Sequence, residues 1–402
     1  MTHALPKNKS QLTVAGLIYV LSFPTLLLSF DAYADDEDTL NFIAGVSRQH
    51  DNNLFRTNSA ESSENITNTY VGVRLDKSYS LQRLKLDFTV TDNKYQDNDF
   101  LDFKSEDYKA AWLWSLTPYL TGTLSAERKQ QLNDFKDLGF STVQNIRTTE
   151  NQHFEADLSP HGNWHLLGGF TRSEQTNSQT FNAESDFTMN SVDAGLKYVY
   201  RSGTAVTLMG HDRSGEYSNR QSNVASLFDT GFDETEVETK LDWLITGKSK
   251  VNLRLAHVKR EHDSFSQRDY SGGQGRADYT WTPTGKLQFV VSAYRQLASF
   301  QTNDANYTRT DTLNFSPLYS ITSKITARAN ANISERSFLG NGPIPSTGRV
   351  DKEKSATFSI DWAPYRSVSL GANVQRSSRT SNVSNLLDYS DTSAGLSANL
   401  YF

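Results

Sequence analysis

The chain has 402 residues, a net charge of −6 at pH 7 and no cysteine. The lack of cysteine excludes disulfides, thiolate metal sites, cysteine nucleophiles and the lipid-modified cysteine of a lipoprotein. The acidic balance gives no support for nucleic-acid binding. Aromatic residues make up 11% of the chain, which argues against disorder because such a chain can bury surface.

The first 34 residues have the pattern of a signal peptide. A short basic start with Lys7 and Lys9 precedes a largely apolar run over 12–30, and small residues follow at Ala32 and Ala34. We expect cleavage after Ala34, which leaves 35–402 as the mature chain. The alternative is an uncleaved membrane anchor, which Pro24 and the small residues disfavour.

After residue 34, no apolar run approaches the ~18 residues that a spanning helix needs. A mature chain that enters a membrane must therefore do so as a β-barrel, because only helices and closed barrels satisfy their backbone groups in lipid.

Apolar and polar side chains alternate along the mature chain with a period of two residues. The pattern is clear over 71–76, 108–116, 237–245 and 325–334. A period of two predicts strands with one apolar and one polar face. Helical spacing is not sustained anywhere after residue 34.

The predicted connections alternate between short and long, and the short ones recur roughly every 40 residues, as in a meander of long hairpins. Short turns are expected near 79–80, 118, 161–162, 202–203, 247–248, 283–285, 321–323 and 364–365. Longer polar loops are expected near 50–64, 97–104, 132–145, 176–186, 218–232, 264–269, 301–306, 339–348 and 381–388. The sequence thus predicts an all-β, antiparallel up-and-down transmembrane barrel of about 18 strands, with 16 possible. Both chain ends would lie on the short-turn side.

Aromatic residues give an independent indication of a membrane interface. All six tryptophans lie within a few residues of a predicted short turn: Trp112, Trp114, Trp164, Trp243, Trp281 and Trp362. Such clustering predicts an aromatic girdle, whereas the core of a soluble β-protein would scatter these rings along the strands.

The C-terminal residues are typical of a barrel assembly signal. Phe402 ends the chain, and Leu400 and Leu396 belong to an apolar series that steps back from it two by two. We expect the barrel assembly machinery to recognise this end.

If the apolar stripe faces lipid, the other face of the strands carries many charges. They are predicted to line the lumen and consist of Arg74, Asp76, Glu155, Asp157, Arg213, Glu238, Lys240, Asp242, Arg254, Arg260, Arg276, Asp278, Arg328, Arg336 and Asp361. Burying so many charges dry would cost several kcal/mol each, so the lumen is predicted to hold water. A barrel of 16–18 strands is wide enough for an aqueous channel.

No motif indicates catalysis, a cofactor or a metal. The histidines are scattered, and no Ser–His–acid set stands out. The glycine-rich segment 271–275 has no following helix, so we expect a flexible loop end rather than a phosphate site. Oxygen ligands at 97–102 could hold Ca²⁺, but their spacing matches no known loop and a solvated acidic loop is the simpler interpretation.

The segment 51–56, with the sequence Asp-Asn-Asn-Leu-Phe-Arg, resembles the start of outer-membrane barrels encoded with exopolysaccharide-biosynthesis genes, the EpsL type. The segment 307–311 and the ending 389–402 are similar to that family as well. The resemblance spans the mature chain and implies a barrel that helps a polysaccharide cross the outer membrane with inner-membrane export proteins. It brings no catalytic residues.

The sequence therefore predicts a pore in the outer membrane of a Gram-negative bacterium, with a polysaccharide as the favoured cargo. Arg213, Arg260 and Arg336 are expected near the external mouth, where guanidinium groups could hold an acidic cargo. The alternatives are a general or small-solute porin, a structural or adhesive barrel with a plugged lumen, and a membrane-embedded hydrolase.

Overall fold

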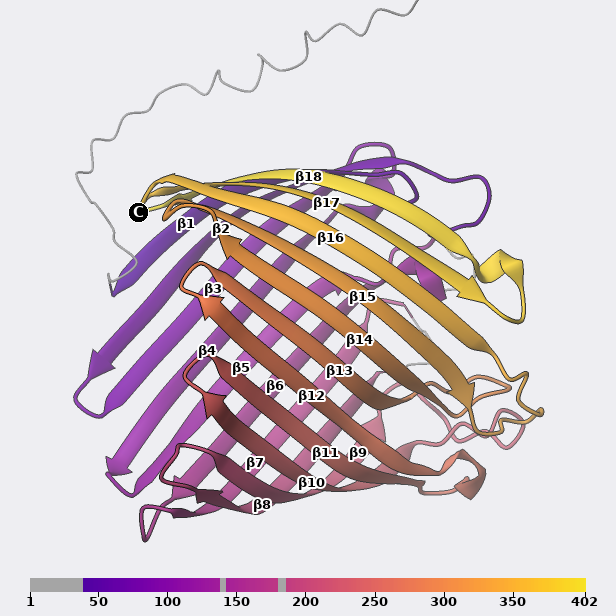
Figure 1. The fold of residues 1–402 in the computed structure, drawn as a ribbon. Helices are drawn as coiled ribbons and strands as arrows, with labels where there is room; N and C mark the ends of the chain where they lie inside the picture. Colours follow the sequence, from indigo (N-terminus) through magenta and orange to yellow (C-terminus); the bar gives the residue numbers. More distant parts are fainter. Residues whose placement is uncertain (1–38, 138–141, 180–185) are drawn as a thin grey trace, which may run out of the picture. The chain divides into compact units, whose positions relative to one another are not determined.

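Eighteen strands account for most of the residues that the structure describes (Figure 1). The computed structural model describes residues 39–137, 142–179 and 186–402. The predicted signal peptide, including Ala32 and Ala34, lies outside the described residues. The strands are β1 (Leu40–Asp51), β2 (Glu64–Tyr79), β3 (Gln82–Tyr95), β4 (Phe103–Thr117), β5 (Leu120–Leu132), β6 (Ile146–Leu158), β7 (Trp164–Asn177), β8 (Phe187–Val199), β9 (Ala205–Tyr217), β10 (Gly231–Thr246), β11 (Ser249–His262), β12 (Tyr270–Thr284), β13 (Leu287–Ser299), β14 (Tyr307–Ser320), β15 (Ile325–Leu339), β16 (Val350–Tyr365), β17 (Val368–Ser381) and β18 (Tyr389–Tyr401).

Each strand pairs antiparallel with its neighbours in sequence, and β1 also pairs with β18. This closes the sheet and leaves no free edge, which is the condition for a β-structure to span lipid. The prediction of an up-and-down barrel of about 18 strands is confirmed. The short turns gather at one end of the barrel and the long loops at the other, and β1 starts and β18 ends at the short-turn end (Figure 1).

Among the described residues, the long loops contain four short 3₁₀ helices: η1 (Asp99–Leu101), η2 (Phe135–Asp137), η3 (Ser266–Arg268) and η4 (Asn385–Leu387). No helix in the described part of the chain is long and apolar enough to cross a membrane.

The glycine-rich segment 271–275 is not a loop end, and this prediction was wrong. It lies inside β12 and pairs with β11 over its whole length. Glycine weakens the interior of a strand, so the pattern suggested a loop. The ladder with β11 holds the segment in the sheet regardless, and pairing with β13 begins at Gly275.

The seam between the first and last strands is fastened at the long-loop end by segment 51–56. The side-chain amide of Asn53, which is fully buried, donates to the carbonyl of Ser390 at 2.9 Å. Arg56 lies 2.8 Å from Asp51 and 3.7 Å from Asp391. Two of the segments that carry the family resemblance thus meet in space and close the barrel.

The C-terminal residue fastens the same seam at the short-turn end. The backbone N–H of Phe42 donates to the carbonyl of Phe402 at 2.6 Å, and the N–H of Phe402 donates back at 3.0 Å. Leu400 and Leu396 pair with Ala44 and Arg48 on β1. The end of the chain is therefore part of barrel closure.

Candidate functional site: a charged channel with an inward-folded loop

The inner face of the barrel is identified by contacts that cross its interior. Asp137, in the connection between β5 and β6, forms an ion pair with Arg336 on β15 at 2.7 Å. Seven strands separate β5 from β15 along the shorter way around the sheet, so this contact runs through the lumen. Residues on the same face as Arg336 therefore point inward.

Strand register carries this assignment around the whole barrel, because residues paired across a ladder share a face. It places all of the predicted lumen residues on the inner face: Arg74, Asp76, Glu155, Asp157, Arg213, Glu238, Lys240, Asp242, Arg254, Arg260, Arg276, Asp278, Arg328, Arg336 and Asp361. The wall is thus lined by both signs of charge.

The opposite, outer face carries the apolar stripe. The six tryptophans Trp112, Trp114, Trp164, Trp243, Trp281 and Trp362 all share it, near the short-turn end. Trp281 stacks on Phe289, and Trp164 meets Tyr198 edge to face. Amphipathic rings in a belt suit the boundary between lipid and water.

A ladder of carboxylates follows β10 along the inner wall. Glu234, Glu236 and Glu238 are 7%, 1% and 2% exposed. Arg213 lies 2.7 Å from Glu234 and 3.2 Å from Glu236, and further arginines from β11 complete the network. Buried charges need such partners, since an unpaired one is costly.

Two of the arginines expected to meet cargo belong to this network. Arg213 and Arg260 both pair with Glu234, the second at 2.8 Å, and their side chains are only 17% and 13% exposed. Arg336 is 16% exposed and paired with Asp137. All three lie toward the long-loop end, but their charges are already balanced.

The same ladder holds the one candidate metal-binding group in the described part of the chain. Ligand atoms of His211, Glu236 and Glu238 lie within 4.8 Å of one another. Arg254 pairs with both carboxylates, Arg213 lies 3.2 Å from Glu236, and Lys240 lies 2.6 Å from Glu238. Because these cations occupy the carboxylates, the group is better described as an ion-pair network than as a metal site.

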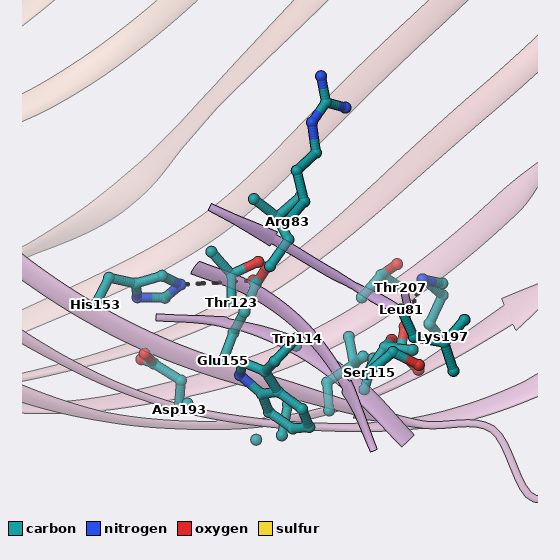
Figure 2. Close-up of a pocket in the computed structure, with 18 of the residues that line it drawn as sticks. Leu81, Arg83, Trp114, Ser115, Thr123, His153, Glu155, Asp193, Lys197 and Thr207 are labelled. Atoms are coloured by element: carbon teal, nitrogen blue, oxygen red, sulfur yellow. Dashed lines mark hydrogen bonds and ion pairs between the residues drawn. The ribbon is translucent and has the colours of Figure 1, made fainter. Parts of the chain in front are cut away.

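A recess of about 750 Å³ opens on the inner wall beside this ladder. Figure 2 shows its labelled side chains, among them Arg83, His153, Glu155, Asp193 and Lys197, which come from β3, β6 and β8. Acidic and basic groups alternate around it, as in the pairs that Asp157 forms with His165 at 2.6 Å and Lys197 at 3.0 Å. The recess can therefore hydrogen-bond a polar solute through donors and acceptors.

In the connection between β5 and β6, residues 133–137 fold into the lumen. Besides the pair with Arg336, the carbonyl of Lys136 accepts from Arg379 at 2.8 Å. The ammonium of Lys136 lies 3.2 Å from Glu353. Residues 133–137 thus reach from β5 to the wall formed by β15, β16 and β17. Residues 142–145 stay on the side of β5 and β6, where Gln144 donates to the carbonyl of Asp102 at 2.9 Å.

Apolar packing fixes the same segment on its other side. Phe135 is 6% exposed and packs with Leu54, Tyr95 and Leu101. It meets Phe55 edge to face, with ring centroids 4.9 Å apart. The segment is therefore anchored between an apolar cluster near β1–β3 and an ionic contact across the channel, and it narrows the lumen.

Electrostatics favour the ionised form of Asp137. Burial alone would raise its pKa, but Arg336 first, then Lys136 and Arg379, hold the pKa below the ordinary aspartate value. The carboxylate is therefore charged, and the contact with Arg336 persists, over the physiological pH range.

Other long loops pack against one another over β9–β14. Arg268 in η3 is fully buried and donates to the carbonyls of Ser226, Thr302 and Ala305. Burial lowers the pKa of Arg268 to about 10, with Arg220 contributing. A single guanidinium therefore joins three loops at this mouth.

The sequence missed several residues of the site. Glu234, Glu236, Glu353 and Arg379 were not predicted, although they lie at alternate positions in strands. The role of Asp137 had no local signal, because its partner Arg336 is 199 residues away. Asp102, considered for Ca²⁺, instead pairs with Lys94 at 2.9 Å.

Residues 253–402 match the model of a family described as "Putative beta-barrel porin 2". No protein of curated function matches the chain.

Three solved structures from Pseudomonas aeruginosa are similar in fold, each with a TM-score of 0.50 and covering 90% of this chain. They are OccK9 (OpdG), 12% identical over 98% of its own chain, OccK2 (OpdF), 10% identical over 97%, and OccK2 in complex with glucuronate, 11% identical over 98%.

The barrel therefore has the fold of outer-membrane porins. The closed sheet, its apolar outer face and this fold place the protein in the outer membrane of a Gram-negative bacterium, as predicted. The matched family is one of porins, in keeping with the prediction of a channel rather than an enzyme.

Proposed function

We propose that the protein is a porin that passes small polar solutes across the outer membrane. The observation that carries the proposal is a closed 18-stranded barrel with a charged inner wall and one segment folded into its lumen. Barrels of 16–18 strands leave room for an aqueous channel. A segment that crosses this channel narrows it to a size for small solutes.

The balance of charges supports limited ion selectivity. Eight of the fifteen predicted lumen residues are cationic and seven are anionic, and most lie in pairs. Paired charges produce a weaker field along the channel than a run of one sign would. We expect solutes to be selected by size and hydrogen bonding more than by net charge.

A polysaccharide cargo is less well supported. Its basis is the resemblance of short segments to EpsL-type barrels, while the family match describes a porin. The segment that narrows the lumen would also obstruct a polymer. Export of an exopolysaccharide stays a prediction, together with its inner-membrane partners.

Uptake into proteoliposomes tests the proposal. We would measure swelling rates with neutral sugars of increasing length and with glucuronate, the ligand named for one matched barrel. Monosaccharides and glucuronate should enter quickly, and rates should fall steeply with oligosaccharide length. Fast entry of long oligosaccharides would instead support a polymer channel.

The matched comparison uses Arg336→Gln, which removes one contact of the inward-folded segment. It should raise the size limit, whereas Arg328→Gln on the same strand, paired with Asp361 nearer the short turns, should not. A barrel that is folded but admits no solute would support a structural role with a plugged lumen.

A further inference from the structure

A groove of about 880 Å³ runs along the outer face of β11–β16. Its floor consists of small outward residues, Gly273, Gly275 and Ala277 on β12 and Ala293 on β13. Larger apolar residues on the neighbouring strands form its sides: Leu253, Leu255, Leu313 and Ile333. A Cβ atom added at Gly273 would meet no atom within 4 Å, so the groove is open there.

A second groove of about 490 Å³ lies on the outer face of β16–β18 and β1. Ala372 and Ala394 form its floor, and its sides are Phe358, Val374 and Leu396. Both grooves are mainly apolar and lie on the lipid-facing surface, with β16 between them. Charged residues border them, Lys352 and Lys354 at the first groove and Arg48 at the second. Their apolar floors and sides are suited to contact with hydrocarbon chains.

Two exposed cations, Lys354 and Arg376, lie between the grooves on adjacent strands. Lys354 pairs with Ser378 in the ladder, and Arg376 with Ala356, which makes the two cations diagonal neighbours on the outer face. Neither has an ion-pair partner within the described part of the chain. Below them, outward residues of β16 are apolar, so the cations mark the external edge of the apolar belt.

The surrounding surface is basic. Over β13–β17, the outer face at this height holds five cations and two carboxylates, a net charge of +3: Arg295, Arg309, Lys352, Lys354 and Arg376 with Asp311 and Glu335. Over β7–β10 the same height holds one cation and four carboxylates, a net charge of −3: Arg172 with Glu174, Asp212, Glu216 and Asp233. The basic patch coincides with the grooves.

We propose that this sector binds a phosphorylated, multiply acylated lipid of the outer leaflet, with the chemistry of lipid A. Its acyl chains lie in the two grooves and a phosphate binds Lys354 and Arg376. Apolar burial and charge attraction act together at such an interface, and each cation near an anionic headgroup strengthens binding. The inference is independent of what the channel transports.

Native mass spectrometry of the full barrel in detergent tests the proposal, with bisphosphorylated lipid A as the probe. The double variant Lys354→Gln/Arg376→Gln should retain lipid A about tenfold or more weakly than the wild type. Lys104→Gln/Arg172→Gln, two outer-face cations on β4 and β7, is the matched control and should retain it unchanged. Gly273→Leu, which fills the first groove, should also weaken retention.

The same measurement with other probes distinguishes the sources of binding. Monophosphorylated lipid A should bind more weakly, and inorganic phosphate alone should not displace the lipid. Equal retention by the wild type and the double variant, with all proteins folded by heat-modifiable gel migration, would overturn the proposal. A second result would also overturn the proposal: the wild type forms an oligomer, and Gly273→Leu dissociates it without any loss of lipid. The groove would then be a subunit interface.

Discussion

Asp137 and Arg336 are 199 residues apart in sequence, yet the carboxylate of one lies 2.7 Å from the guanidinium of the other. The contact joins the connection between β5 and β6 to the opposite wall, at a point where both side chains are largely buried. It explains how a polar segment that could extend into solvent is instead held inside the channel. The behaviour of the pore should depend on it.

Loss of this contact should loosen the segment. Arg336→Gln removes a charge-assisted hydrogen bond worth about 1.5–3 kcal/mol, so open states of the segment become more frequent. Single-channel recordings should show a higher mean conductance and more gating events than the wild type. Arg328→Gln should keep the conductance and gating of the wild type. If Arg336→Gln keeps them too, the contact between Asp137 and Arg336 does not hold the segment in the channel.

The contact should also respond to acid. The pKa of Asp137 is lowered in the folded state, although burial opposes this, because Arg336, Lys136 and Arg379 surround the carboxylate. Protonation of Asp137 therefore favours the state in which the segment no longer contacts Arg336. The stabilisation is fully present above the ordinary aspartate pKa of about 3.9 and is lost as pH falls through the lower folded value.

We therefore expect conductance to be constant from about pH 5 to pH 8 and gating to increase only below about pH 4. Recordings across this range would show it, and Asp137→Asn should gate at every pH. A transition centred near pH 6 would indicate that a histidine controls the segment instead.

The register on β10 can be tested by exchanging polarity on its two faces. Leu241 points outward and Lys240 inward, where the ammonium lies 2.6 Å from Glu238. A lipid-facing Arg costs about 2–4 kcal/mol at the membrane midplane, so Leu241→Arg should reduce the heat-modifiable, folded fraction. Lys240→Leu should reduce it less, because Arg254 still neutralises Glu238. If both variants lost the same folded fraction, the inner and outer faces of β10 would be wrongly assigned.

Removal of Phe402 should slow assembly. The deletion abolishes two backbone hydrogen bonds with Phe42 at the seam, and it removes the terminal aromatic ring. We expect more protease-sensitive periplasmic protein and less folded barrel, by pulse-chase fractionation, while Phe402→Tyr assembles normally. Normal insertion of the deletion variant would show that the terminal residue is dispensable.

The strands were predictable because lipid on one side and water on the other impose an alternation that each strand shows by itself. The eight short turns and nine long loops of the structure lie where the sequence predicts them. The prediction of a loop end at 271–275 was wrong for a physical reason. The outward residues of this segment are small, so the sequence shows no alternation of apolar and polar side chains there. The same residues form the floor of the outer groove.

The inward-folded segment could not be predicted, because residues 133–145 have the composition of any exposed polar loop. Its direction is decided by Arg336, Glu353 and Arg379, far along the chain. The charged wall was predictable as a set of inward residues, but the pairing of Arg213 and Arg260 with Glu234 was not. Cleavage after Ala34 stays a prediction that N-terminal sequencing would test.

Conductance of the purified wild-type barrel in planar bilayers tests the central claim most directly. A water-filled channel lined by balanced charges should give stepwise currents in potassium chloride with weak preference between cation and anion. The steps should become larger in Arg336→Gln and stay unchanged in Arg328→Gln. A correctly folded barrel that carries no current, with or without Arg336, would contradict the account.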